Sequence, residues 1–312
     1  MPTAQKGNIN LLVNTDEPGK NFNVSLKSNL ANEKAEYGSV KKMLVLSDIE
    51  GNFAALRKLL QGNHVIDENF NWVFDKGHLV LLGDFVDRGT MVTEVLWLIY
   101  SLEEKAKTAG GQVHYILGNH EIMNMSGDLN YVDPRYIEHA TMMNRHYMHL
   151  FGQDTEIGRW LATKNVVERI GNIMFTHGGI SSYVNYLQLP LKEINDLSRR
   201  FYTDSTYKYP DKRLEILFSD FGPFWYRGYY EGTPAATMEQ IDSTLQFYNI
   251  RQIITGHTIV MNIGTLFDGK LINTDVHHAG GHSEALLIEN GKFWRVNAAG
   301  EQFPVSPLQI SN

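Results

Sequence analysis

The sequence predicts one α/β domain with a sheet on the inside and helices outside. Two observations favour this class: short continuous apolar runs alternate with segments of helical spacing, and polar residues follow the runs at their carboxyl ends. Apolar residues make up 43% of the 312-residue chain, which is enough to bury a sizeable core. We expect a single domain over residues 41–312, preceded by an N-terminal arm or hairpin over residues 1–40.

The expected elements follow one another along the chain. In the arm, a hairpin is predicted from the pairing of residues 11–13 with 22–27. Short apolar runs, typical of strands covered on both faces, predict strands over 43–47, 78–83, 112–118 and 251–256, and a two-stranded hairpin over 166–179. Helical spacing predicts helices over 52–61, 91–107, 134–150, 155–163, 190–201 and 235–248. Antiparallel strands joined by Gly or Asn turns are predicted within 264–273, 283–290 and 292–297.

Charge and composition exclude several classes of partner. A formal net charge of −7 and a pI near 5.9 argue against a nucleic-acid or an anionic-membrane surface. No apolar run approaches the ~20 residues that a membrane span requires. The absence of cysteine excludes disulfides, thiolate metal sites and a cysteine nucleophile. The first 14 residues lack the apolar core of a signal peptide, so we expect a cytoplasmic protein, or a secreted or periplasmic one if a signal was removed.

Polar side chains gather where the predicted strands end. The stretches concerned are SDIEGN (47–52), GDFVDRG (83–89), GNHE (118–121), THGG (176–179) and TGHT (255–258). Ligands of α/β sheets lie beyond the carboxyl ends of the strands, so we expect these stretches to meet. Together they offer oxygen and nitrogen donors but no sulfur: Asp48, Glu50, Asp84, Asn119, His177 and His257. Such a set suits Mn, Fe, Zn or Mg, and six donors are too many for one tetrahedral ion but natural for two.

This donor set is typical of phosphoryl chemistry with two divalent ions. Asp84 is predicted to bridge the ions, with Asp48 and Glu50 on the first; the second would take Asn119, His177 and His257. A water shared by two such ions loses its proton near neutral pH and becomes the nucleophile. Arg88 is predicted to clamp the phosphate oxygens. His120 is predicted to protonate the leaving alkoxide while Asp87 holds its ring.

The five stretches resemble the metallophosphoesterase superfamily of calcineurin-like enzymes, and GDFVDRG with GNHE resembles its PPP phosphoprotein-phosphatase family. WYRGYY (225–230) and INTDVHHAGG (272–281) resemble the bacterial-type branch, the Shewanella-like protein phosphatases. The resemblance covers roughly residues 43–297 and implies a central β-sandwich of mixed sheets flanked by helices. It implies the same roles for Arg88, His120 and Asp87, and it matches Arg227 to a second phosphate-binding arginine. The metal ligands that it implies are Asp48, Asp84, Asn119, His177 and His257.

Glu50 departs from the family pattern. The family has GDxHG where this chain has SDIEG, so Glu50 stands at the position of a metal-binding histidine. A carboxylate adds negative charge and favours a harder cation such as Mn²⁺ or Mg²⁺ over Zn²⁺. We expect Glu50 to bind metal and manganese to be favoured. A weakened first site, or a solvent-facing Glu50, is the alternative. His277 and His278, near Asp275, are possible additional donors.

The leading functional hypothesis is a metal-dependent phosphatase acting on phosphate monoesters. The resemblance implies phospho-Ser/Thr or phospho-Tyr proteins as first substrates. One alternative is a hydrolase of small phosphoesters or dinucleoside polyphosphates. Another is a non-catalytic phosphate-binding module with a degenerate first metal site. The presence of Arg88, His120 and Asp87 favours an enzyme, because binding alone needs no proton donor.

Overall fold

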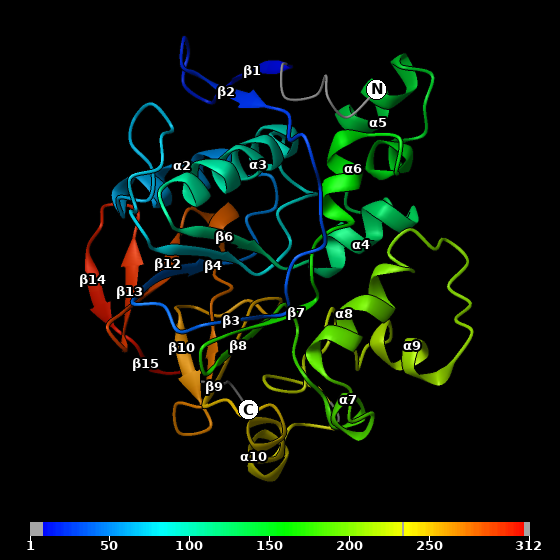
Figure 1. Ribbon diagram of the computed structural model, residues 1–312, viewed down its shortest axis with the longest axis vertical. Coiled ribbons are helices and arrows are strands. Elements are labelled where there is room, and N and C mark those ends of the chain that lie inside the picture. The colour runs from blue at the N-terminus through cyan, green and yellow to red at the C-terminus, as the bar shows by residue number, and fades with distance from the viewer. Residues whose placement is uncertain (1–8, 233, 309–312) are drawn as a thin grey trace.

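The computed structural model describes residues 9–232 and 234–308, and two β-sheets packed face to face form its centre (Figure 1). Residues 1–8 of the predicted arm and 309–312 of the predicted domain lie outside the described residues. The first sheet has six strands in the order β14-β13-β12-β4-β5-β6. Their bounds are Lys42–Leu46 (β4), His78–Leu81 (β5), Gln112–Tyr115 (β6), Glu284–Glu289 (β12), Lys292–Asn297 (β13) and Gln302–Pro304 (β14). Strands β4, β5 and β6 are parallel, whereas β12, β13 and β14 are antiparallel to their neighbours.

The second sheet has seven strands in the order β15-β10-β11-β9-β8-β7-β3. Their bounds are Glu36–Tyr37 (β3), Val167–Ile170 (β7), Ile173–Thr176 (β8), Gln252–Thr255 (β9), Gly264–Leu266 (β10), Leu271–Asn273 (β11) and Ser306–Pro307 (β15). Strands β7 and β8 form the predicted hairpin, and β8, β9 and β11 run parallel. The predicted sandwich of mixed sheets is confirmed.

Strand β4 shows that the six-stranded sheet is buried on both of its faces. Its side chains alternate: Leu44 and Leu46 enter the core beneath the helices, whereas Met43 and Val45 enter the core between the sheets. All four are almost fully buried, so the strand reads as a continuous apolar run. Helices α2 (Phe53–Gly62) and α3 (Val92–Thr108) cover the six-stranded sheet (Figure 1).

Helices on the opposite side cover the seven-stranded sheet. Helices α7 (Ser182–Tyr186), α8 (Leu191–Arg199) and α10 (Met238–Phe247) contribute buried side chains to one core with β7, β8, β9 and β11 (Figure 1). A sheet that is buried on both faces needs apolar residues at successive positions, which is the pattern that predicted these strands. None of the described helices is long and apolar enough to cross a membrane.

Several helices differ from the prediction. The helix expected over 134–150 is divided into α5 (Pro134–Met142) and a 3-10 helix, η1 (Tyr147–Phe151), because Asn144 between them adopts a left-handed backbone with φ of 53°. Helix α6 (Glu156–Leu161) lies where it was expected. Two short helices, α4 (Asn119–Ser126) and α9 (Lys212–Leu217), were missed, as was α7. Each has eight residues or fewer, too short to present a clear apolar period.

The N-terminal hairpin packs on α2. Strands β1 (Asn10–Asn14) and β2 (Asn21–Ser25) pair antiparallel, as the sequence predicted. Phe22 is buried and stacks on Phe53 with ring centroids 6.2 Å apart. The Asp16 carboxylate accepts hydrogen bonds of 2.8 and 2.6 Å from the Arg57 guanidinium. An apolar contact and a bidentate ion pair therefore fasten the hairpin to the domain.

A chain of three titratable side chains, the partly buried His78 and the buried His114 and Glu168, connects the two sheets away from the carboxyl ends of the strands. The Nδ1 atom of His78 lies 2.8 Å from Nε2 of His114, and Nδ1 of His114 lies 2.7 Å from the Glu168 carboxylate. Burial and the neighbouring His114 lower the pKa of His78 to about 4. His78 is therefore neutral in the folded chain near neutral pH.

This chain of histidines should make stability fall as the pH falls. Between pH 6.5, the usual histidine pKa, and pH 4, the unfolded chain binds a proton at residue 78 and the folded chain does not. We expect the melting temperature to drop through this window, and less so in His78→Gln. Melting curves from pH 7 to pH 4 measure this, with the exposed His64→Gln as control. Equal slopes in wild type and His78→Gln would contradict the assignment.

Candidate active site

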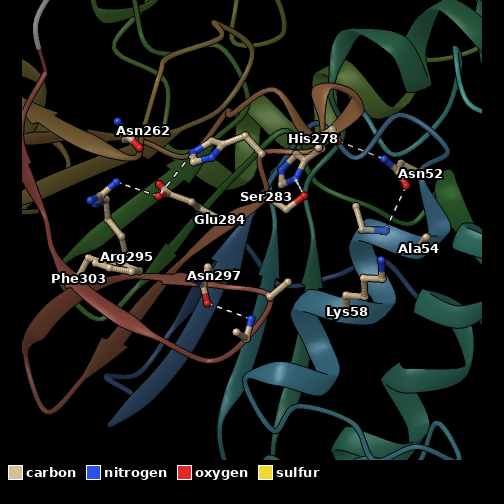
Figure 2. A pocket seen from close by; sticks show the side chains of 15 residues that line it. Asn52, Ala54, Lys58, Asn262, His278, Ser283, Glu284, Arg295, Asn297 and Phe303 are labelled. Carbon is tan, nitrogen blue, oxygen red and sulfur yellow. Dashed lines mark hydrogen bonds and ion pairs between the residues drawn. The ribbon is translucent and has the colours of Figure 1, made fainter.

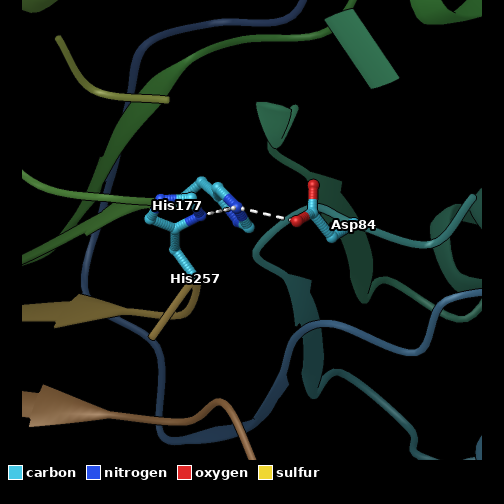
Figure 3. A group of neighbouring side chains, drawn as sticks. All are labelled: Asp84, His177 and His257. Atoms are coloured by element: carbon cyan, nitrogen blue, oxygen red, sulfur yellow. Dashed lines mark hydrogen bonds and ion pairs between the residues drawn. The ribbon is translucent and has the colours of Figure 1, made fainter. Parts of the chain in front are cut away.

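The predicted ligands other than Glu50 lie at one edge of the sandwich, where parallel strands of both sheets end. Asp48 and Asp84 follow β4 and β5, His177 follows β8 directly, and His257 follows β9. The donor atoms of Asp84, His177 and His257 lie within 4.8 Å of one another (Figure 3). The His177 Nε2 atom is 3.1 Å from Asp84 Oδ2 and 3.1 Å from His257 Nδ1. Side chains from both sheets therefore converge on a single point.

Two further predicted ligands adjoin this group. The Asn119 Oδ1 atom lies 3.0 Å from His177 Nε2, and the Asp48 carboxylate accepts a 3.1 Å hydrogen bond from the His257 amide. Asn119 is the first residue of α4, and both side chains are buried. The structure therefore brings together five of the six predicted ligands: Asp48, Asp84, Asn119, His177 and His257.

Glycines allow this close approach. A Cβ atom on Gly118 would lie 2.2 Å from Oδ1 of Asp84, and one on Gly256 would lie 2.5 Å from Oδ2 of Asp48. Any larger residue would push the carboxylates out of the site. This is the physical reason for a glycine before Asn119 and His257.

Left-handed backbone is concentrated at the same edge. Six predicted site residues have φ between 50° and 70°, a region that non-glycine residues rarely adopt: Asp48, Glu50, Asp84, Asp87, Arg88 and His257. Each such residue costs about 1–3 kcal/mol and persists only where its surroundings hold it. Strain of this kind clusters at active sites and ligand clamps.

Glu121 is one residue that holds the strained loops, and sequence reasoning missed it. Its carboxylate accepts 2.8 Å hydrogen bonds from the amides of Asp84, Phe85 and Gly118, and one of 2.9 Å from the Tyr115 hydroxyl. It is fully buried and ties the loop after β5 to the start of α4. Its place as the last residue of GNHE, three residues after the N-cap Gly118, was the available signal.

Buried negative charge accumulates beside the donors. Burial raises the pKa of Asp48, and the charge of Asp84 adds to the effect. Burial, with the charges of Asp48 and Asp84, also raises the pKa of Asp275, which follows β11 at the same edge. Burial alone would raise the pKa of Asp84, but the imidazoles of His177 and His120 lower it. Asp275 was not among the predicted site residues, although it lies in the INTDVHHAGG stretch.

These charges fit divalent cations. Carboxylates gathered away from water repel one another unless a positive charge lies between them. In the described residues that charge comes in part from His177, whose pKa the carboxylates of Asp84 and Asp48 raise to about 9 against the effect of burial. Burial and the charge of His177 lower the pKa of His257. A set of carboxylate, amide and imidazole donors in this arrangement is suited to a divalent transition-metal ion.

The predicted acid and its partner are in contact. Nδ1 of His120 lies 2.6 Å from the Asp87 carboxylate, and Nε2 lies 3.8 Å from Asp84 Oδ2. Burial opposes the charge of His120, but Asp84 and the hydrogen bond to Asp87 raise its pKa. Asn124, also missed by sequence reasoning, donates from Nδ2 to Asp87 (2.7 Å) and to the His120 carbonyl (2.9 Å). Asn124 therefore fixes both members of the pair.

The two predicted phosphate-binding arginines lie nearer the solvent. Arg227 donates to the His257 carbonyl (2.6 Å) and to the Thr258 hydroxyl (3.2 Å), and its side chain is 42% exposed. The Arg88 side chain is 45% exposed and forms an ion pair with Glu50. Buried donors with half-exposed guanidinium groups beside them are suited to a phosphate arriving from solvent.

Glu50 is the predicted ligand that the structure places elsewhere, on Arg88. If it binds metal as predicted, Glu50→His should raise the zinc content relative to manganese, because imidazole is softer than carboxylate. Elemental analysis after dialysis against equal concentrations of both ions measures this, with the exposed Glu68→His as control. Unchanged metal contents would mean that Glu50 serves Arg88 and binds no ion.

His278, considered as an additional donor, lines a different cavity (Figure 2). This cavity has a volume of about 710 Å³ and is also lined by Asn52, Lys58 and Arg295. The Nδ1 atom of His278 lies 3.1 Å from the Ser283 hydroxyl, and His277 is exposed. Neither histidine belongs to the group formed by Asp84, His177 and His257.

Comparisons with known proteins identify the family and the fold. The family model described as calcineurin-like phosphoesterase matches residues 41–261. Shewanella-like protein phosphatase 1 of Plasmodium berghei is 28% identical over 233 residues, which are 72% of this chain and 63% of the relative. The chain thus spans just under two thirds of that relative's length.

Solved structures extend the likeness to the whole fold. The crystal structure of the cold-active protein-tyrosine phosphatase of a psychrophilic Shewanella species superposes with a TM-score of 0.87 at 39% identity, covering 94% of this chain and 89% of that one. A protein serine/threonine phosphatase from Saccharomyces cerevisiae shares the fold, with a TM-score of 0.59 at 19% identity over 82% of this chain and 76% of that one. The family model covers the edge where Asp48, Asp84, His177 and His257 meet, and the chain belongs to the calcineurin-like phosphoesterase family.

Proposed function

We propose that the chain is a dinuclear, metal-dependent phosphatase that hydrolyses phosphate monoesters. One observation carries the proposal: the His120–Asp87 pair, joined at 2.6 Å, stands beside the buried group of Asp84, His177 and His257. A binding module would need no proton donor beside a cluster of metal donors. Membership of the phosphoesterase family supports the same reaction class.

The proposed metal ligands are the five that the structure brings together, Asp48, Asp84, Asn119, His177 and His257. Glu50 is the sixth, and it would have to leave Arg88 to reach an ion. Manganese is the proposed metal, because oxygen donors outnumber nitrogen donors in this set. When bound, two divalent ions activate the attacking water and neutralise charge on the phosphoryl group. The Asp84 carboxylate contacts His177, from the seven-stranded sheet, and the His120 amide at the start of α4. These two contacts support its assignment as the shared ligand.

The chain's own residues would bind the phosphate and move one proton. Arg88 and Arg227 offer guanidinium groups to the phosphoryl oxygens, whose charge they offset. His120 holds its Nδ1 proton against Asp87, so Nε2 is the atom that donates a proton to the departing oxygen. The ester bond between phosphorus and that oxygen breaks, water supplies the new oxygen on phosphorus, and the products are inorganic phosphate and an alcohol or phenol.

The proposed substrates are phosphorylated proteins. Two names support this: the Plasmodium berghei relative is named a Shewanella-like protein phosphatase, and the Shewanella structure is named a protein-tyrosine phosphatase. A phosphotyrosine peptide is therefore the first substrate to test. Hydrolysis of small phosphoesters or dinucleoside polyphosphates is the second possibility.

The test is a set of parallel assays on the manganese-loaded chain. Phosphate release is measured from phosphotyrosine and phosphoserine peptides of one sequence, from a dinucleoside tetraphosphate, and from 4-nitrophenyl phosphate. We expect turnover of the peptides and of the aryl ester. Preference for the dinucleotide would replace the proposed substrate class, and an absence of turnover on all four would contradict a phosphatase function.

A further inference from the structure

A tyrosine lies between the two groups proposed to handle the phosphate ester. The Tyr131 ring packs against the His120 ring with centroids 5.0 Å apart and planes at 65°. The Arg88 guanidinium carbon lies 4.9 Å from the centroid of the same ring. Within residues 9–232 and 234–308, Tyr131 is the only aromatic side chain with ring contacts to both.

Tyr131 also presents a free surface. It is 46% exposed, whereas His120 and Asp84 are 4% and 2% exposed. The ring is therefore the solvent-facing side chain in the contact with His120.

The position of His120 defines what would cover the ring. A proton donor must lie within hydrogen-bond reach of the oxygen that it protonates, here the oxygen joining phosphorus to the leaving group. The atoms attached to that oxygen therefore lie on the His120 side of the site. Tyr131 provides the apolar surface there.

We propose that Tyr131 forms the binding surface for the leaving group and favours aryl over alkyl phosphate esters, which among phosphoproteins means phosphotyrosine. The inference rests on the proposed phosphatase function. A phenyl leaving group can pack on the tyrosine ring in an offset or edge-to-face arrangement, whereas the methylene of phosphoserine offers little area. Tyr131 is thus a specificity residue that takes no part in bond breaking.

A leucine substitution isolates the ring from the backbone. The Arg88 amide donates a 2.9 Å hydrogen bond to the Tyr131 carbonyl, and this bond does not depend on the side chain. Tyr131→Leu therefore keeps the loop anchored and keeps apolar volume, while removing the aromatic surface. Tyr131→Phe keeps the ring, and Tyr186→Leu, on α7 and 84% exposed, is the matched control.

The experiment compares kcat/KM of the metal-loaded variants on peptides that differ only in phosphotyrosine or phosphoserine. We expect Tyr131→Leu to lower kcat/KM for phosphotyrosine by about 2- to 12-fold, mainly through KM, and to leave phosphoserine nearly unchanged. Tyr131→Phe and Tyr186→Leu should resemble wild type. Calorimetric binding of phenylphosphonate and methylphosphonate, which are not hydrolysed, should show the same loss of aryl preference.

Equal losses on both peptides would overturn the proposal, because they would mean that Tyr131 acts only by orienting Arg88. Unchanged aryl preference in Tyr131→Leu would overturn it as well. Wild-type turnover with no aryl preference contradicts this inference alone. Absence of wild-type turnover on every ester contradicts the phosphatase function itself.

Discussion

Asp84→Asn is expected to abolish turnover and to remove metal from the site. The carboxylate of Asp84 lies 3.1 Å from His177 Nε2, and its Oδ1 accepts a 2.9 Å hydrogen bond from the His120 amide. It thus contacts residues from both sheets. An amide retains the shape but loses the negative charge that a shared ligand supplies to two cations. We expect kcat to fall by at least about 10³-fold.

Two measurements check this result. Elemental analysis should find less than half of the wild-type metal content in Asp84→Asn, since both ions lose a ligand. Circular dichroism should find an intact fold, because the side chain is part of the site and not of the apolar core. Asp220→Asn is the matched control, an exposed aspartate elsewhere on the chain. Full metal content with full activity in Asp84→Asn would refute the bridging role.

His120→Gln is expected to slow hydrolysis in proportion to how much the leaving group needs a proton. Loss of a general acid typically costs about 10²- to 10⁴-fold. A serine alkoxide needs protonation, whereas a phenol with a pKa near 10 departs more easily. We therefore expect kcat on phosphoserine to fall by about 10²-fold or more, and kcat on 4-nitrophenyl phosphate to fall far less.

The dependence on leaving group is measured with a series of aryl and alkyl phosphates of graded basicity. In His120→Gln the slope of log kcat against leaving-group pKa should become steeper than in wild type. The control is His139→Gln, an exposed histidine of α5. Parallel slopes in wild type and variant would remove His120 as the acid. Tyr131→Leu should act in the opposite sense, since it affects the aryl ester more.

Much of the site could be predicted because its residues follow strands that the sequence marks clearly. Asp48, Asp84, Asn119, His177 and His257 each stand beyond the end of a short apolar run, and parallel strands bring such ends together. The family that these stretches resemble is confirmed. Residues whose role is to position other site residues do not follow a recognisable strand in the sequence, so they were not predicted.

Glu121, Asn124 and Asp275 illustrate this limit. Glu121 and Asn124 lie in α4, whose eight residues serve the site and show no apolar period. Their partners, Asp84 and Asp87, are more than 30 positions away, so their contacts depend on the packing of α4 against the loop after β5. Asp275 follows β11, and its place at the edge required knowing that β11 runs parallel to β9.

Because the two β-sheets divide the donors between them, an ion bound among the donors would link the two layers. The six-stranded layer supplies Asp48, Asp84 and Asn119, and the other supplies His177 and His257. Ion binding and folding are then coupled, because the ion binds only when both layers are in place. At an ion concentration a hundred times its dissociation constant, ion binding would raise the free energy of unfolding by about 2.7 kcal/mol. A chelator would therefore lower the stability of the fold as well as remove the proposed activity.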